Sequence, residues 1–144
     1  DKPQRQRGGR LHAQACLAEF LSERGMNYRF EMSSPLSAES ACSRISPYLA
    51  FGVISIREIL DMLSRAREQI AQSELAPKAQ SQWKQSFKSF ESRLHWHCHF
   101  IQKLESEPEL EWRNLHRGYD GLREGDWNEA HFQALVPRFP PPRL

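Results

Sequence analysis

The chain has 144 residues, with 20 lysines and arginines against 18 aspartates and glutamates, and 39% of its residues are hydrophobic. This profile is typical of one globular domain that can bury a sizeable core. The net charge of +2 argues against a histone-like or polybasic protein and leaves only a local basic face open. The three cysteines, Cys16, Cys42 and Cys98, are widely spaced, so no disulfide framework or paired-cysteine metal site is expected. A cytoplasmic or otherwise intracellular location follows as the expectation.

Membrane insertion is not expected from the hydropathy pattern. The longest apolar run, residues 48–56, is about half of the roughly 20 residues that a spanning helix needs, and it contains Gly52. The first ten residues are charged, and no apolar stretch follows them, so no secretory signal is predicted. Because the chain does not begin with methionine, we expect a piece of a longer protein.

The first part of the chain predicts one helix and one long loop. Apolar residues recur at three- and four-residue spacings from about 10 to 24, until Gly25 stops the pattern. Residues 27–41 mix aromatic side chains with serine and proline and have no sustained period. An ordered loop of this length is typical of a functional segment.

Two capping patterns predict the next helices. Ser46 is placed as the N-cap of a short helix, with Pro47 in its first position and Gly52 as its stop. Ser55 and Glu58 form a capping-box pattern, which predicts a helix over 56–72.

The strongest periodicity in the chain predicts a long helix over 78–104. Its apolar positions alternate four- and three-residue steps; they are Trp83, Phe87, Phe90, Leu94, His97, Ile101 and Leu104. Asp126 is expected to cap a final short helix that ends near residue 135. No stretch alternates as a strand would, so the predicted fold class is all-α, a helical bundle-like fragment. We expect a polar lead-in over 1–9, one domain over 10–134 and a divergent proline-rich tail over 135–144.

A histidine cluster within 95–99 raises the question of a metal site. On a helix only His95 and His99 lie on one face, and no further ligand motif accompanies them. We therefore expect no metal. His97 is expected to pack into the apolar stripe with a hydrogen bond, while His95 and His99 stay partly solvated.

Residues 42–47 are the best candidate for an anion site. Hydroxyl groups, the Arg44 guanidinium and a helix start fall within six residues. A capped helix with a surface arginine explains the same residues equally well, and the two interpretations stay open at this point.

The same stretch carries a family resemblance. Residues 43–58 read SRISPYLAFGVISIRE, which resembles the S-R-L-S-P-Y-L-x-x-G-x-(I/L)-S-x-R-E signature of the FAD-binding domain of DNA photolyases and cryptochromes. Tyr28 precedes it and a tryptophan-bearing segment, SRLHWHCHF at 92–100, follows it in the family's order. The resemblance implies an FAD cofactor with these contacts: Tyr28, Ser43, Arg44, Ile45, Ser46 and Phe90.

The resemblance also implies a DNA partner and a reaction. Arg93, Trp96 and His97 would face a flipped-out pyrimidine lesion, which needs an aromatic stacking surface. An intact relative would be a blue-light DNA-repair lyase that splits cyclobutane pyrimidine dimers by electron transfer from reduced FAD. The alternatives are a cryptochrome-type flavin photoreceptor without repair activity and a helical interaction fragment without a cofactor.

Two departures from the family pattern shape the expectation for this chain. Arg93 and His97 stand where photolyases have a glutamate and an arginine, and the family's W-x-x-G-x-T-G segment does not follow residue 134. We therefore expect a domain truncated at both ends, inactive by itself and with weak or no FAD retention. Truncation would leave Trp83, Phe87, Phe90 and Trp96 uncovered, and we expect self-association through that surface.

Overall fold

The fold is known from a computed structural model that describes residues 5–122 and 124–135. These residues are mostly helical, and no strand occurs among them. The all-α prediction is confirmed to that extent. None of the helices in the same ranges has the length and apolar character needed to cross a membrane. The chain divides after His99 into two compact units, which are called here the N-terminal unit (described from residue 5 to 99) and the C-terminal unit (described from 100 to 135, without 123).

The helices are as follows, in chain order. The N-terminal unit holds α1 (Arg10–Ser22), the 3-10 turn η1 (Arg24–Asn27), α2 (Tyr28–Glu31), α3 (Ala38–Ala41), α4 (Ser46–Ala50), α5 (Ile56–Gln72) and most of α6 (Pro77–Ser106). The C-terminal unit holds the end of α6, the 3-10 turns η2 (Pro108–Glu111) and η3 (Arg117–Tyr119), and α7 (Glu129–Leu135).

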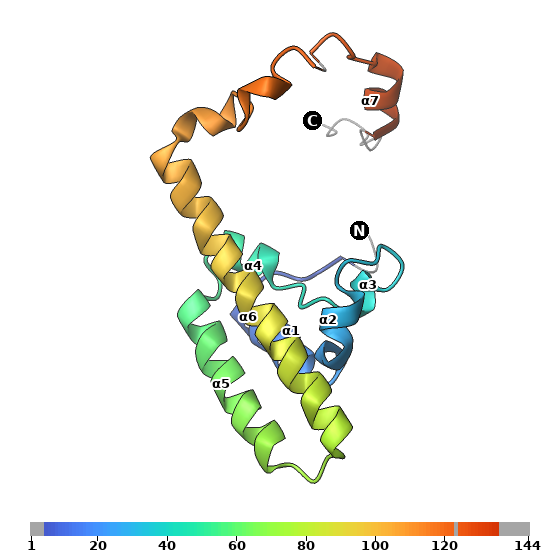
Figure 1. Ribbon diagram of the computed structural model, residues 1–144, viewed down its shortest axis with the longest axis vertical. Helices are drawn as coiled ribbons and strands as arrows, with labels where there is room; N and C mark the ends of the chain where they lie inside the picture. The colour runs from blue at the N-terminus through green and yellow to red at the C-terminus, as the bar shows by residue number, and fades with distance from the viewer. Residues whose placement is uncertain (1–4, 123, 136–144) are drawn as a thin grey trace, which may run out of the picture. The chain divides into compact units, whose positions relative to one another are not determined.

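Helices α5 and α6 form the long antiparallel pair of the N-terminal unit (Figure 1). Only residues 73–76 connect them, and the Arg67 guanidinium of α5 donates to the Glu91 carboxylate of α6 at 2.6 Å. Helix α1 packs against this pair. The core consists of buried apolar side chains from all of these helices and from the segment between α1 and α5: Ala13, Leu17, Phe20, Leu21, Tyr28, Ile45, Tyr48, Ile54, Ile59, Leu63, Ala66, Trp83, Phe87, Phe90 and Leu94.

The start of α5 is fixed by the capping box that the sequence predicts. The Ser55 hydroxyl accepts from the Glu58 amide at 3.2 Å, and the Glu58 carboxylate accepts from the Ser55 amide at 3.0 Å. Arg10 of α1 donates to the same carboxylate. These hydrogen bonds, with that of the Ser55 amide as the largest cause, lower the pKa of Glu58. One carboxylate therefore starts α5 and ties α1 to it.

Three details of the helix predictions are wrong. Residues 27–41 are ordered, as expected, but they are not one long loop, because η1, α2 and α3 lie within or across them. Ser46 does not cap α4, since the helix begins at Ser46 and Ile45 holds the N-cap position without a side-chain bond. The last helix begins at Glu129, where the Asn128 side chain accepts from the His131 amide at 3.0 Å, so Asn128 takes the role expected of Asp126.

The two glycines predicted as stops have clear steric reasons. Gly52, directly after α4, has a left-handed φ of 63° that an L side chain rarely adopts. Gly25 lies so close to α1 that an added Cβ would be 2.3 Å from the Phe20 carbonyl oxygen. The chain can therefore turn sharply at η1 only with glycine at 25.

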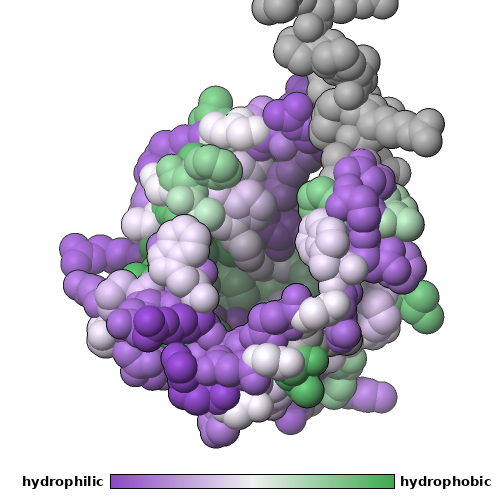
Figure 2. All heavy atoms as spheres, turned by 90° about the horizontal axis from the view of Figure 1, so that it is seen from above, coloured by the Kyte–Doolittle hydropathy of each residue, from purple (hydrophilic) through white to green (hydrophobic). Residues whose placement is uncertain are grey.

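The prediction that truncation uncovers the aromatic stripe of α6 is wrong for three of its four members. Trp83, Phe87 and Phe90 are buried, because α1 and α5 of the same unit cover them. Trp96 alone of the four is substantially exposed, at 49%. On the face that Figure 2 shows, hydrophobic residues lie in small groups among hydrophilic ones.

Candidate functional site

The predicted anion segment runs from the end of α3 to the start of α4. Its side chains divide between surface and core: Arg44 and Ser46 are exposed, Ser43 is half-buried, and Ile45 is 2% exposed and belongs to the core. Arg44 has a φ of 56°, the single non-glycine positive φ among the described residues. Such a conformation is unfavourable for an L residue and persists only where surrounding contacts hold it.

An open pocket of about 750 Å³ lies beside this segment. Its lining comes from the segment before α1, from α1, η1, α3 and α4, and from the loop between α3 and α4: Gln6, Cys16, Glu19, Arg24, Glu39, Ser40, Arg44 and Tyr48. The Arg44 guanidinium is 3.7 Å from the Glu39 carboxylate, beyond hydrogen-bond distance, and its side chain is 41% exposed. Arg44 is therefore the cation in this pocket that is open to a ligand.

Arg24 lies deeper in the pocket and is engaged with the backbone. Its Nη2 donates to the carbonyl oxygens of Cys16 at 3.1 Å and Ser43 at 3.0 Å, and its Nη1 donates to that of Cys42. Its guanidinium lies over the Phe20 ring at 5.5 Å from the centroid. Nothing in the sequence pattern singles out this residue, because its partners are backbone atoms of distant segments.

The cysteine in the pocket, Cys16, is partly buried and hydrogen-bonded. Burial, as the largest cause, raises the pKa of the Cys16 thiol, which outweighs the opposing effect of Arg24. Its Sγ donates to the Ser43 carbonyl oxygen at 3.3 Å. A neutral, hydrogen-bonded thiol is a poor nucleophile.

Two of the predicted flavin contacts, Tyr28 and Phe90, lie together inside the core. Their ring centroids are 5.9 Å apart, and both rings pack on Phe20, at 5.4 and 4.8 Å. Burial, as the largest cause, raises the pKa of the Tyr28 phenol, and the nearby Arg93 opposes that rise. Phe20 was missed at the sequence level as the third member of this aromatic cluster.

The predicted lesion-facing residues lie along α6. Arg93 and Trp96 are exposed, and the Trp96 ring meets His99 edge to face at 6.0 Å. His97 is half-buried, and its Nδ1 is shielded and has no hydrogen-bond partner among the described residues. The expectation that His97 is hydrogen-bonded is wrong for that atom.

No cluster of three or more metal-ligating side chains occurs in the described part of the chain. His95 and His99 are both exposed, in agreement with the expectation of solvated side chains.

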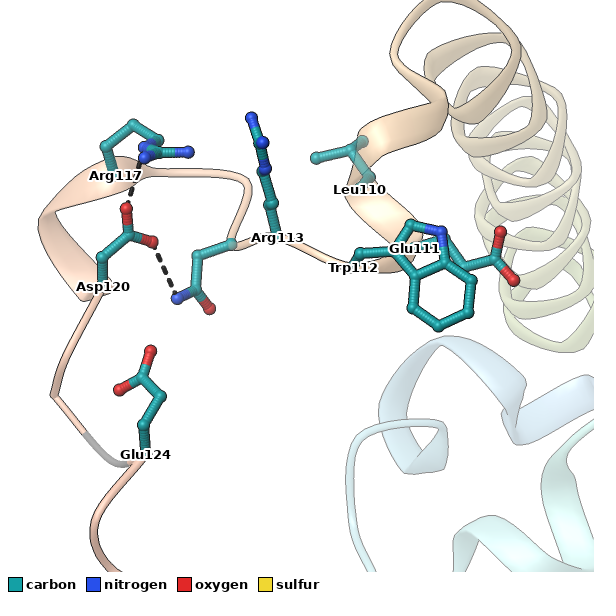
Figure 3. A pocket seen from close by; sticks show the side chains of 8 residues that line it. Leu110, Glu111, Trp112, Arg113, Arg117, Asp120 and Glu124 are labelled. Atoms are coloured by element: carbon teal, nitrogen blue, oxygen red, sulfur yellow. Dashed lines mark hydrogen bonds and ion pairs between the residues drawn. The ribbon is translucent and has the colours of Figure 1, made fainter.

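A second pocket, of about 560 Å³, lies within the C-terminal unit (Figure 3). The Asp120 carboxylate stands at its edge and accepts from Arg117 at 2.8 Å and from Asn114 at 3.1 Å. None of the residues that line it is buried. No sequence pattern predicts this pocket, and one of its cations, Arg117, already pairs with its Asp120 carboxylate.

Comparison with protein-family models, with curated proteins and with solved structures finds no match to this chain. The candidate site is therefore defined by its own geometry. Arg44, in the pocket next to Arg24 and Glu39, is the group whose placement fits a predicted role.

Proposed function

We propose that the chain is part of a photolyase- or cryptochrome-like FAD-binding domain and that Arg44 binds the diphosphate of FAD. The proposal joins the SRISPYLAFG signature at 43–52 with the position of Arg44. Arg44 is exposed into a pocket of sufficient size for a diphosphate, and its guanidinium can form paired hydrogen bonds with phosphate oxygens. This placement is the observation that carries the proposal.

The residues present fit the diphosphate and not the flavin ring. Arg44 offers a charged fork, whereas Tyr28 and Phe90, the aromatic contacts that the resemblance implies, are enclosed in the core. Glu19 and Glu39 line the same pocket, so a diphosphate has to displace the Glu39 carboxylate from Arg44. Affinity for FAD is accordingly expected to be weak, and the ring would need residues beyond those of this pocket.

The chemistry follows from the family resemblance. Reduced flavin supplies the light-excited electron that splits a pyrimidine dimer, while the chain binds and orients the cofactor. Trp96, half-exposed on α6, offers an aromatic face against which an extruded base could stack. Light-dependent loss of thymine dimers separates this reading from a cryptochrome-type photoreceptor, which binds flavin without repair.

Binding measurements with three probes test the proposal. We expect FAD and inorganic pyrophosphate to bind the chain in calorimetry and riboflavin, which has no phosphate, to bind much more weakly. Arg44→Gln should weaken pyrophosphate binding about tenfold, and Glu39→Gln should strengthen it, because a competing carboxylate is lost. Arg65→Gln, on the exposed face of α5, is the matched control and should change nothing.

Two results would count against the proposal. Equal affinity for riboflavin and FAD would place the ring, not the diphosphate, in the site. A chain that binds neither FAD nor pyrophosphate would leave the interpretation of a cofactor-free helical fragment.

A further inference from the structure

We propose that Arg24 is the positioning residue of the loop at 42–44. Its guanidinium joins the end of α1 to this loop and thereby holds Arg44 in the left-handed conformation in which it lines the pocket. The part of this inference that concerns a ligand rests on the proposed function, whereas the part that concerns the loop does not.

Three successive carbonyl groups of the loop, those of residues 42–44, accept hydrogen bonds from side chains. Arg24 donates to the carbonyl oxygens of Cys42 and Ser43, and the Gln6 side chain donates to that of Arg44 at 2.7 Å. The Cys16 thiol also donates to Ser43. Each peptide plane from 42 to 44 is thus fixed by a side chain from a distant segment.

Arg24 is itself firmly held. Its side chain is only 17% exposed, it packs over Phe20, and it also binds the Cys16 carbonyl at the middle of α1. A guanidinium can donate in several fixed directions within one plane, whereas a lysine ammonium is a point charge on a flexible stem. Lysine at position 24 therefore keeps the charge but loses the simultaneous contacts with Cys16, Cys42 and Ser43.

The left-handed φ of Arg44 explains why such fixing is needed. A residue with a Cβ is unfavourable at a φ of 56°, so a free loop would return Arg44 to an ordinary conformation. That return would swing the side chain out of its present place in the pocket. The hydrogen bonds from Arg24 to the Cys42 and Ser43 carbonyl oxygens oppose this change of conformation.

The Arg24→Lys variant of the full chain tests the inference by nuclear magnetic resonance. The backbone couplings and carbon shifts of Arg44 report its φ directly. Hydrogen exchange at the amides of Cys42 and Leu49, which donate to Ala38 at 2.9 Å and Ile45 at 3.1 Å, reports the loop's flanks. We expect Arg44 to lose its left-handed signature. We also expect the amides of Cys42 and Leu49 to exchange about tenfold faster than in the wild type, whereas the exchange rates of the core amides of α6 stay the same.

Arg65→Lys is the matched control, because Arg65 is exposed on α5 and pairs with Asp61 of the same helix. It should leave both readouts unchanged. An Arg24→Lys variant that keeps the left-handed signature and the wild-type exchange rates would overturn the inference. If Arg24→Lys does not fold, the Arg24→Lys/Arg44→Gly double variant decides, since glycine accepts a φ of 56° without strain. Recovered folding supports the inference, and continued unfolding contradicts it.

Pyrophosphate titration separates this inference from the proposed function. If both hold, Arg24→Lys weakens pyrophosphate binding about as much as Arg44→Gln does, by about tenfold. If the wild-type chain binds no pyrophosphate, the proposed function fails, and the Arg44 signature still decides whether Arg24 positions the loop.

Discussion

The two units of the chain differ in what their apolar side chains do. In the N-terminal unit, side chains from α1, α5 and α6 meet and bury one another, with Phe20, Phe87 and Phe90 almost completely enclosed. In the C-terminal unit, none of residues 100–122 and 124–134 is buried. Trp112 there is 82% exposed and Trp127 is 67% exposed.

The difference lies in helix length and not in the supply of apolar residues. Helices α1, α5 and α6 have 13, 17 and 30 residues, enough to present apolar stripes over several turns to one another. The elements after α6 have between three and seven residues. A one-turn or two-turn element covers too little area to shield a tryptophan, so local helical order arises there without a core.

The largest expected effect is on the core of the N-terminal unit. Phe90→Ala should lower the free energy of unfolding by about 3–5 kcal/mol, because it removes a ring packed on both Phe20 and Tyr28 and leaves a cavity. Urea denaturation followed by circular dichroism measures it.

The matched change in the other unit is Trp112→Ala, for which we expect a change below about 0.5 kcal/mol. A comparable loss in both variants would show that the C-terminal unit also depends on a packed core and would abolish the contrast between the units.

A smaller effect is expected at Ser86, a buried polar residue of α6. The Ser86 hydroxyl donates to the Met26 carbonyl oxygen at 2.7 Å and accepts from the Arg29 amide at 3.3 Å, which ties α6 to η1 and α2. Ser86→Ala leaves both backbone groups without this partner and should cost about 1–3 kcal/mol. Ser106→Ala is the control, since that exposed hydroxyl only donates within its own helix. Equal stability of the Ser86→Ala variant and the wild type in thermal unfolding would refute this prediction.

The smallest effect concerns the ion pair between α5 and α6. The Arg67 hydrogen bond, the largest cause, lowers the pKa of Glu91 below its ordinary value of 4.5. The unfolded state then binds the proton more readily, so the pair's contribution is present above the unfolded pKa and is lost as the pH falls through the folded one. The pair is about one-third exposed on each side, so we expect Glu91→Gln to cost at most about 1 kcal/mol at pH 7.

Unfolding of the two proteins at a series of pH values checks this prediction. The difference between Glu91→Gln and the wild type should shrink as the pH falls below 4.5. Glu109→Gln breaks an exposed pair with Arg113 in the C-terminal unit and should show no such dependence. A pH-independent difference at Glu91 would mean that the lost contact is not ionic.

Prediction from sequence succeeded where one local rule decides the outcome. The Ser55–Glu58 capping box, the Gly52 stop and the apolar positions of α6 up to Leu94 depend on spacings within one helix, and the structure confirms them. Ile101 and Leu104, which continue the predicted stripe, are 54% and 50% exposed, so the prediction of a buried face is wrong beyond Leu94. It failed where several neighbouring residues suit the same local role. Ser46 is the first residue of α4 and not its cap, Asn128 and not Asp126 caps α7, and short helices lie within 27–41.

The candidate site was predictable only in part, because several of its contacts join segments that are far apart in the chain. Arg44 could be found from its neighbours in the chain, because hydroxyl and guanidinium groups cluster at 43–46. Arg24, Gln6 and Glu39 could not be found in this way. Their contacts with Arg44 and its loop form only when α1 and the segment before it pack against that loop. Tyr28 and Phe90 meet edge to face and both contact Phe20, and spacing in the sequence does not reveal this cluster.

The sequence by itself determined the helical class, the long helices and their apolar faces, because backbone hydrogen bonding and the 3.6-residue period act over short distances. Only the tertiary structure decided which of those faces were covered, that Arg44 took a left-handed conformation beside a pocket, and that the aromatic cluster went inside. Those outcomes depend on contacts between residues far apart in the chain, and the free energy of such contacts exists only when all the partners are in place together.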